Sequence, residues 1–178
     1  MEIALYVLLA LVVIAAILLI VAIFVKKDYA TEREIVINRP KQEVFEYIKY
    51  LKNQNEWSKF STTTDPNMKT TYSGTDGTPG FIYGWESDNK GIGKGTQEIT
   101  KIIDGERIDW KYLFAGYPPT YCYWITETVS ENAARIKWGF AFRMNYPLNL
   151  MNLFFDKLID NDLDSELVNL KTKMECMK

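Results

Sequence analysis

Histidine is absent from all 178 residues of the sequence, and its absence removes several kinds of chemistry at once. Histidine is the usual general base near neutral pH, the usual activator of serine and cysteine nucleophiles, and the commonest transition-metal ligand. Any catalysis by this chain must therefore use carboxylates, lysine, tyrosine or water.

Cysteine is also scarce. The two cysteines, Cys122 and Cys176, lie far apart and do not have the spacing of a zinc site. The sequence therefore predicts no metal and no other cofactor, and either cysteine can be an ordinary free thiol.

The chain has no excess of positive charge either. Its 21 lysines and arginines are balanced by 23 acidic residues, which gives a net charge of -2. Proteins that bind nucleic acid need a basic surface, so we set nucleic acid aside as a partner. What the chain has instead is 47% hydrophobic residues, with 14% aromatic residues, which indicates one domain with an aromatic-rich core.

Residues 3–25 contain no charge, no proline and no glycine. As a helix this run is about 34 Å long, enough to cross a bilayer. A cleaved signal peptide is the alternative, but the run is long for one, no basic residues precede it, and no small-residue cleavage site follows it. We therefore expect residues 1–27 to be an uncleaved transmembrane anchor and residues 28–178 to form the globular domain.

The charges around this run predict its orientation. Glu2 precedes it, whereas Lys26 and Lys27 follow it directly, with Arg33 and Arg39 close behind. By the positive-inside rule, the protein is a single-pass membrane protein with its globular domain on the cytoplasmic side.

The rest of the chain is typical of a meander of strands. A first strand is expected over 31–38, followed by a short helix that begins at Pro40 and a second short helical segment over 53–60. Six further strands are expected over residues 69–72, 81–86, 95–103, 107–114, 121–129 and 135–144. Short turns between them predict antiparallel neighbours. In the last strand, alternation predicts that these residues face the core: Ile136, Trp138, Phe140, Phe142 and Met144.

A long helix is predicted from Pro147 to Met174. The apolar residues of its predicted buried face recur mostly every three or four positions, and they are Met151, Phe154, Phe155, Leu158, Ile159, Leu163, Leu167, Leu170 and Met174. So large an apolar face must be covered, and the strands are the expected cover. The acidic residues of this helix, Glu166 among them, are expected on its solvent face.

Several segments along the chain follow the sequence pattern of one known family. Residues 32–40 followed by 44–48 resemble the opening signature of the START-like SRPBCC superfamily, and residues 83–85 with 93–95 are similar to its membrane-anchored polyketide cyclase or dehydrase-like branch. The resemblance implies an α+β helix-grip fold, in which a curved antiparallel sheet of about seven strands wraps around the C-terminal helix, with two short helices after the first strand. Lys59 and Phe60 depart from the Pro-Trp common in that family.

The inward-facing rings, together with a few polar groups, are typical of an apolar ligand cavity between sheet and helix. The residues predicted to line it are Trp57, Phe60, Tyr83, Trp85, Gln97, Trp110, Tyr112, Trp124, Trp138, Phe142, Phe155 and Leu158. Gln97 would be a polar group in an apolar interior and would need a partner. In the alternative interpretation, the same rings only fill a packed core.

Three functions remain open on the sequence alone. The leading hypothesis is a membrane-anchored binding domain for a hydrophobic small molecule, either a lipid or a polyketide-like compound. The second is an enzyme that cyclises or dehydrates such a ligand, with Tyr83, Tyr112 or Gln97 orienting a carbonyl group, and the third is a ligand-free interaction module. An ionisable group with a perturbed pKa in the cavity would favour the enzyme, and the strand alternation predicts none there.

Overall fold

The computed structural model describes residues 2–59 and 65–177, without the side chain of Asp156. Its elements follow in the order α1 (Glu2–Phe24), β1 (Asp28–Ile37), α2 (Lys41–Ile48), the 3-10 helix η1 (Leu51–Glu56), β2 (Lys69–Ser73), β3 (Ile82–Glu86), β4 (Lys94–Ile103), β5 (Arg107–Phe114), β6 (Thr120–Ser130), β7 (Ala133–Arg143), the 3-10 helix η2 (Leu148–Met151) and α3 (Asn152–Cys176). The predicted α+β helix-grip order is confirmed.

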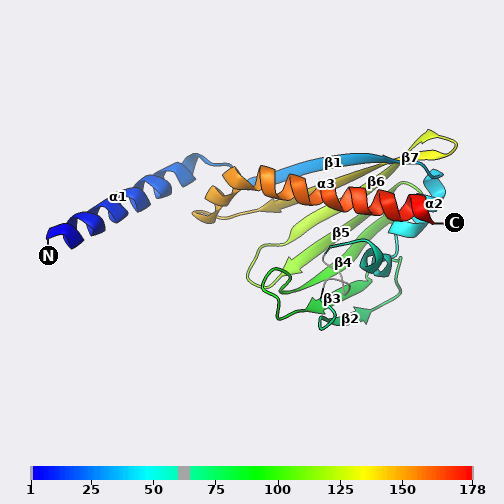
Figure 1. Cartoon of the computed structure of the whole chain (residues 1–178), viewed down its shortest axis with the longest axis horizontal. Helices are drawn as coiled ribbons and strands as arrows, with labels where there is room; N and C mark the ends of the chain where they lie inside the picture. Colours follow the sequence, from blue (N-terminus) through cyan, green and yellow to red (C-terminus); the bar gives the residue numbers. More distant parts are fainter. Residues whose placement is uncertain (1, 60–64, 178) are drawn as a thin grey trace.

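All seven strands form one antiparallel sheet in the order β1-β7-β6-β5-β4-β3-β2. Strands β2 to β7 are a meander, because each is hydrogen-bonded to the next along the chain. Strand β1 pairs with β7, so α2 and η1 carry the chain from one edge of the sheet to the other. The sheet curves around α3, and α1 projects away from the domain (Figure 1).

The inner face of the sheet holds the core. Ile136 and Trp138 on β7, Trp124 on β6 and Trp110 on β5 are all buried. The β7 alternation and the preference for an inward Trp124 agree with the prediction from strand periodicity. Helix α2 adds Phe45, which is fully buried.

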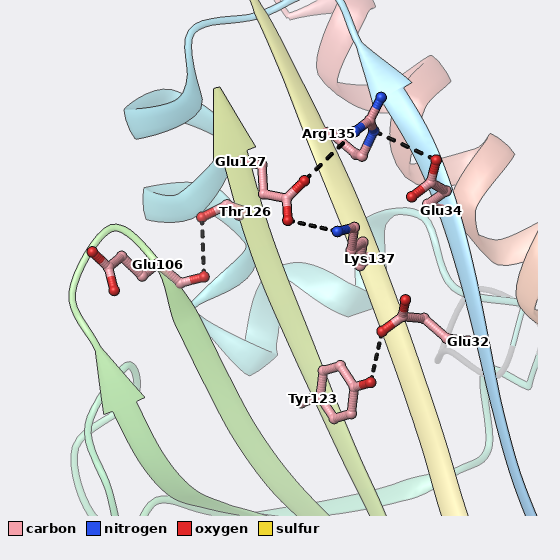
Figure 2. A network of polar contacts seen from close by, with 8 residues as sticks. All are labelled: Glu32, Glu34, Glu106, Tyr123, Thr126, Glu127, Arg135 and Lys137. Carbon is pink, nitrogen blue, oxygen red and sulfur yellow. Dashed lines mark hydrogen bonds and ion pairs between the residues drawn. The ribbon is translucent and has the colours of Figure 1, made fainter. Parts of the chain in front are cut away.

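The outer face is polar (Figure 2). Lys137 Nζ lies 2.6 Å from Glu127 Oε1, and Arg135 lies 3.5 Å from Glu34 and 3.6 Å from Glu127. Arg135 and Lys137 alternate along β7 with the buried Ile136 and Trp138, as expected for a strand with one solvated face. A site for an apolar ligand must therefore lie on the inner face.

Helix α3 differs from the prediction at its start. The chain forms η2 before α3 begins at Asn152, and the predicted buried residues Met151, Phe154 and Leu158 are 44%, 64% and 60% exposed. The buried stripe of α3 is Leu163, Leu167, Leu170 and Met174. Only one stripe of a helix can contact the sheet, and Phe154 and Leu158 lie on the side of α3 that faces away from it, while Met151 lies in η2 before α3 begins.

Helix α1 contacts the domain through its C-terminal end. Ala22 is the buried residue of α1. The side-chain amide of Asn149 donates to Ala22 O at 2.7 Å and to Val25 O at 2.8 Å, and Asn152 donates to Lys26 O at 3.0 Å. By length and composition, α1 is the one helix among the described residues that could cross a membrane.

Candidate functional site

A cavity of about 320 Å³ lies between the inner face of the sheet, η1 with the residues after it, and α3. One wall of the cavity is formed by side chains of β3, β4, β5 and β7, and the opposite wall by side chains of α3. The curvature of the sheet leaves this space between the two walls. Its lining residues are Gln54, Asn55, Trp57, Ser58, Tyr83, Trp85, Gly91, Ile92, Gln97, Tyr112, Phe114, Trp138, Phe140, Ile159, Asp162, Leu163 and Glu166.

The structure brings half of the sequence-predicted site residues together around this cavity. Those that line it are Trp57, Tyr83, Trp85, Gln97, Tyr112 and Trp138. They come from strands β3, β4, β5 and β7 and from the residue after η1. Phe114, Phe140 and Ile159 also line the cavity and complete its apolar wall, although they were not among the predicted cavity residues.

Two of the predicted residues are part of the core instead. Trp110 and Trp124 are 1% and 0% exposed, do not line the cavity, and contact each other with ring centroids 4.7 Å apart. Strand alternation gives the face of a residue but not its distance from the open volume, which explains this error.

Three other predicted residues, Phe142, Phe155 and Leu158, lie towards the start of α3. Phe142 and Phe155 pack against each other at 5.3 Å, and Tyr29 stacks on Phe142 at 5.0 Å, away from the cavity lining. Leu158 is exposed because its stripe of α3 points away from the sheet. Phe60 lies outside the described residues.

A row of polar groups crosses the sheet under the cavity. Gln97 on β4 is directly opposite Tyr83 on β3 and Tyr112 on β5. Gln97 is 1% exposed, and its Nε2 has no hydrogen-bond partner among the described residues. Burial raises the pKa of the Tyr83 hydroxyl to about 12, and burial also raises that of Tyr112. Both phenols therefore remain protonated donors at neutral pH.

Glu166 on α3 supplies a carboxyl group on the opposite wall. It is 3% exposed, and the backbone N–H of Lys59 donates to its Oε1 at 2.9 Å. Burial in this apolar site raises the pKa of the carboxyl, and hydrogen bonds from residues 58 and 59 reduce that rise. The expectations that Glu166 is solvated, and that no ionisable group with a perturbed pKa lines the cavity, are both wrong.

The sequence did contain a signal for Glu166. It lies three residues after Leu163 and four before Leu170, which is the spacing of the buried stripe of α3. The neighbouring Asp162 is different, because its carboxylate is half exposed at the cavity rim and pairs with Lys59 Nζ at 2.5 Å.

The polar row and Glu166 are near enough to interact. Burial is the main cause of the raised Tyr112 pKa, and the charge of Glu166 raises it further. An amide N–H and phenolic O–H groups on one wall can hold an oxygen atom of a ligand, while a carboxyl on the other wall can exchange a proton with it.

The described part of the chain has no cluster of side chains suited to bind a metal ion. No group of three histidine, cysteine, aspartate or glutamate side chains there could hold an ion. Cys122 is buried and Cys176 exposed, and both are free thiols. Burial raises the pKa of the Cys122 thiol, which makes it a poor nucleophile.

The sequence matches the profile of a known family. The profile of the family described as polyketide cyclase / dehydrase and lipid transport matches residues 29–175. A search of curated proteins found no match.

Several solved structures are similar to this chain. Truncated norcoclaurine synthase from Thalictrum flavum gives a TM-score of 0.64 at 9% identity over 85% of this chain and 96% of the other. The di-domain ARO/CYC BexL from the BE-7585A biosynthetic pathway gives 0.61 at 20% identity over 83% of this chain and 46% of the other. The Aha1 dimer from Colwellia psychrerythraea gives 0.58 at 15% identity over 83% and 97%. At these identities the similarity shows a shared fold.

Proposed function

The chain belongs to the polyketide cyclase / dehydrase and lipid transport family, and from this premise we propose that its cavity binds an apolar small molecule carrying a hydrogen-bond-accepting oxygen. The wall of aromatic rings supplies the apolar contact. Gln97 and Tyr112 of the polar row supply donors for the oxygen, beside the Tyr83 hydroxyl, which donates to Asn55 Oδ1 at 3.5 Å.

The observation that carries this proposal is the amide of Gln97. Leaving a buried donor without a partner costs about 1 to 3 kcal/mol. A ligand carbonyl would remove that cost. The cavity, about 320 Å³ in volume, is at the lower end of the range of small-molecule sites, about 300 to 1,000 Å³, so a compact ligand of one to three rings fits best.

A matched pair of probes tests this proposal. The bicyclic ketone 1-tetralone and its parent hydrocarbon tetralin differ by one oxygen. Binding is measured with the full chain in nanodiscs, against empty nanodiscs. We expect the ketone to bind about tenfold more tightly, since one hydrogen bond contributes about 1 to 1.5 kcal/mol.

The variant Gln97→Leu should lose this preference while still binding tetralin. The control is Gln42→Leu, at an exposed position on α2, which should behave as the parent. If the parent protein bound neither probe, the rings would be a packed core or part of an interaction module. If it bound both probes with equal affinity, Gln97 would not contact the ligand oxygen.

Glu166 favours a second candidate, an enzyme of the cyclase type. A carbonyl held by Gln97 and Tyr112 would lie opposite a carboxyl whose pKa is raised by burial. A base at that position can remove a proton from the carbon next to the carbonyl, the first step of many cyclisations and dehydrations, and the donors can stabilise the resulting enolate oxygen.

Deuterium exchange separates the two candidates. In heavy water, the enzyme should speed the exchange of the hydrogens next to the carbonyl of bound 1-tetralone, and Glu166→Gln should abolish the acceleration without loss of binding. A binding domain without catalysis would give tight binding and exchange at the rate of free solution.

We also infer that α1 anchors the protein in a membrane as an uncleaved span. Its C-terminal end is hydrogen-bonded to Asn149 and Asn152 of the domain, which supports retention in the mature protein over removal as a signal sequence. For the cytoplasmic orientation, an impermeant thiol reagent should label the exposed Cys176 only after cells are opened. Labelling of intact cells would reverse the orientation.

A further inference from the structure

Five apolar side chains at the start of α3 and in η2 are exposed. They are Leu148 (63%), Met151 (44%), Leu153 (57%), Phe154 (64%) and Leu158 (60%), and we call them the helix-start cluster. They all lie within residues 148–158, whereas singly scattered apolar residues would need no explanation.

The cluster covers a broad arc of the helix. Leu153 and Phe154 are neighbours in a helix and so point in directions about 100° apart, yet both are exposed. Phe155, the next residue, packs on Phe142, and the exposed Lys157 lies on the helix beside the direction of Leu153. A helix with a broad exposed apolar arc and a lysine beside it is typical of a lipid–water interface.

The cluster ends abruptly along α3. Seven residues beyond Phe154 and Leu158, the same directions are taken by Asn161 and Ser165, both exposed and polar. At about 1.5 Å per residue, the apolar character is lost within about 10 Å of the point where α3 begins.

That starting point is fixed at the end of α1. Asn149 and Asn152 hydrogen-bond to backbone carbonyls of residues 22 to 27, where the apolar run of α1 gives way to Lys26 and Lys27. Figure 1 shows the start of α3 beside the end of α1. A span of this length would end at the surface of the hydrocarbon core, so the start of α3 would lie at the same level.

We propose that the helix-start cluster is immersed in the lipid bilayer interface beside α1 and holds the domain against the membrane surface. The depth of about 10 Å matches that of interfacial helices, which bury their apolar side chains about 5 to 10 Å deep. The exposed Tyr146 suits this boundary, where tyrosine is enriched, and Lys26, Lys27 and Lys157 would face anionic headgroups.

This immersion would bring the cavity near the lipid. Ile159 lines the cavity and directly follows Leu158 of the cluster, so the edge of the site would lie within about one helical turn of the interface. An apolar ligand could then enter from the bilayer.

The test measures depth in the full chain. Phe154→Cys and, as a control, Asn161→Cys are each made with Cys176→Ser and labelled with an environment-sensitive fluorophore. Cys122 is buried and should not react. The proteins are reconstituted into vesicles of phosphatidylcholine with a minority of phosphatidylglycerol, with and without lipids spin-labelled near the headgroup.

We expect blue-shifted emission at position 154, quenched by the spin-labelled lipids several-fold more strongly than at position 161. Equal, water-like emission at both positions would overturn the inference. So would a blue shift at position 154 that the lipids do not quench and that grows with protein density, because it would show contact between copies of the chain.

The inference rests on the proposed anchoring by α1, and the two fail in distinguishable ways. Flotation of the protein with vesicles reports anchoring. Loss of flotation would remove both proposals, whereas flotation with a water-exposed position 154 would remove only the second. Binding of 1-tetralone is measured separately and is independent of either outcome.

Discussion

Trp138 and Trp124 are neighbouring indoles on the inner face that differ in what they border. Their ring centroids are 5.6 Å apart, but Trp138 lines the cavity and Trp124 does not. Trp124→Ala should cost about 3 to 5 kcal/mol of unfolding free energy, since a packed ring loses all its contacts. Trp138→Ala should cost clearly less, because part of its surface already faces open volume, and should weaken 1-tetralone binding.

Denaturant unfolding of the two variants beside binding titrations gives the comparison. The two tryptophans are directly opposite each other on the adjacent strands β6 and β7. A difference between the two variants therefore reports on the cavity and not on the position in the sheet. Equal destabilisation, with ligand binding unaffected by the loss of Trp138, would show that the rings form only a packed core.

Glu166 gives a prediction about pH. Its pKa is raised in the folded state, so folding favours the protonated carboxyl. The stability it supports is complete below the unfolded pKa, near 4.3, and is lost as the pH rises through the folded value. Glu166→Gln cannot ionise, so its stability should exceed that of the parent increasingly as the pH rises across this window.

Thermal unfolding midpoints of parent and variant between acid and neutral pH measure that divergence. Glu166→Asp, which keeps an ionisable carboxyl, should retain a pH dependence like that of the parent. Parallel curves for the parent and Glu166→Gln would contradict a raised pKa at this position.

At the scale of elements, strands were predictable and the packing of the last helix was not. Strand alternation and turn residues are local, so the observed β5 has the predicted bounds, 107–114. Helical periodicity in α3 fits two stripes, one through Phe154 and Leu158 and one through Leu163 and Leu167. Which stripe meets the sheet depends on tertiary contacts, and this choice also decided whether Glu166 faces the cavity or solvent.

The same limit applies to the cavity. Periodicity assigned Tyr83, Gln97 and Tyr112 to the inner face correctly, because each is on a strand with clear alternation. It could not separate them from Trp110, which shares that face but lies in the packed core. The position of the open volume depends on the curvature of the sheet and on where α3 lies. Neither can be predicted from a local sequence pattern.

The pairing of β6 with β7 depends on a glycine. Gly139 is directly opposite Tyr123, and a Cβ atom on Gly139 would lie 2.1 Å from the Tyr123 ring. The Tyr123 hydroxyl donates a hydrogen bond to Glu32 Oε2 at 2.6 Å (Figure 2), and the guanidinium carbon of Arg107 lies 4.2 Å from the centroid of the ring. Gly139→Ala should therefore displace the ring and cost about 1 to 3 kcal/mol.

A double-mutant cycle identifies the cause. In a Tyr123→Ala background the clash is absent, so adding Gly139→Ala should cost only a few tenths of a kcal/mol. An unchanged cost in that background would mean that backbone conformation, rather than the overlying ring, requires glycine at position 139.

At the scale of the whole molecule, the domain should fold without α1. The core residues belong to the chain from Tyr29 onward, apart from Ala22. A chain that begins at Asp28 should therefore unfold cooperatively, with native-like near-ultraviolet circular dichroism. Its helix-start cluster would remain exposed, and we expect it to associate with vesicles of phosphatidylcholine and phosphatidylglycerol.

The cost of this truncation can be traced to one side chain. Asn149 is fully buried and would lose Ala22 O and Val25 O, the acceptors of its side-chain amide. Water can reach the amide once residues 1–27 are removed, so the loss is the net contribution of two hydrogen bonds, and the truncated domain should be less stable than the full chain by about 1 to 3 kcal/mol. Asn149→Leu removes the same two hydrogen bonds, so it should destabilise the full chain by a similar amount and should change the stability of the truncated domain little. Denaturant midpoints of the four proteins decide the matter, and the absence of a cooperative transition in both truncated forms would make α1 part of the folding unit.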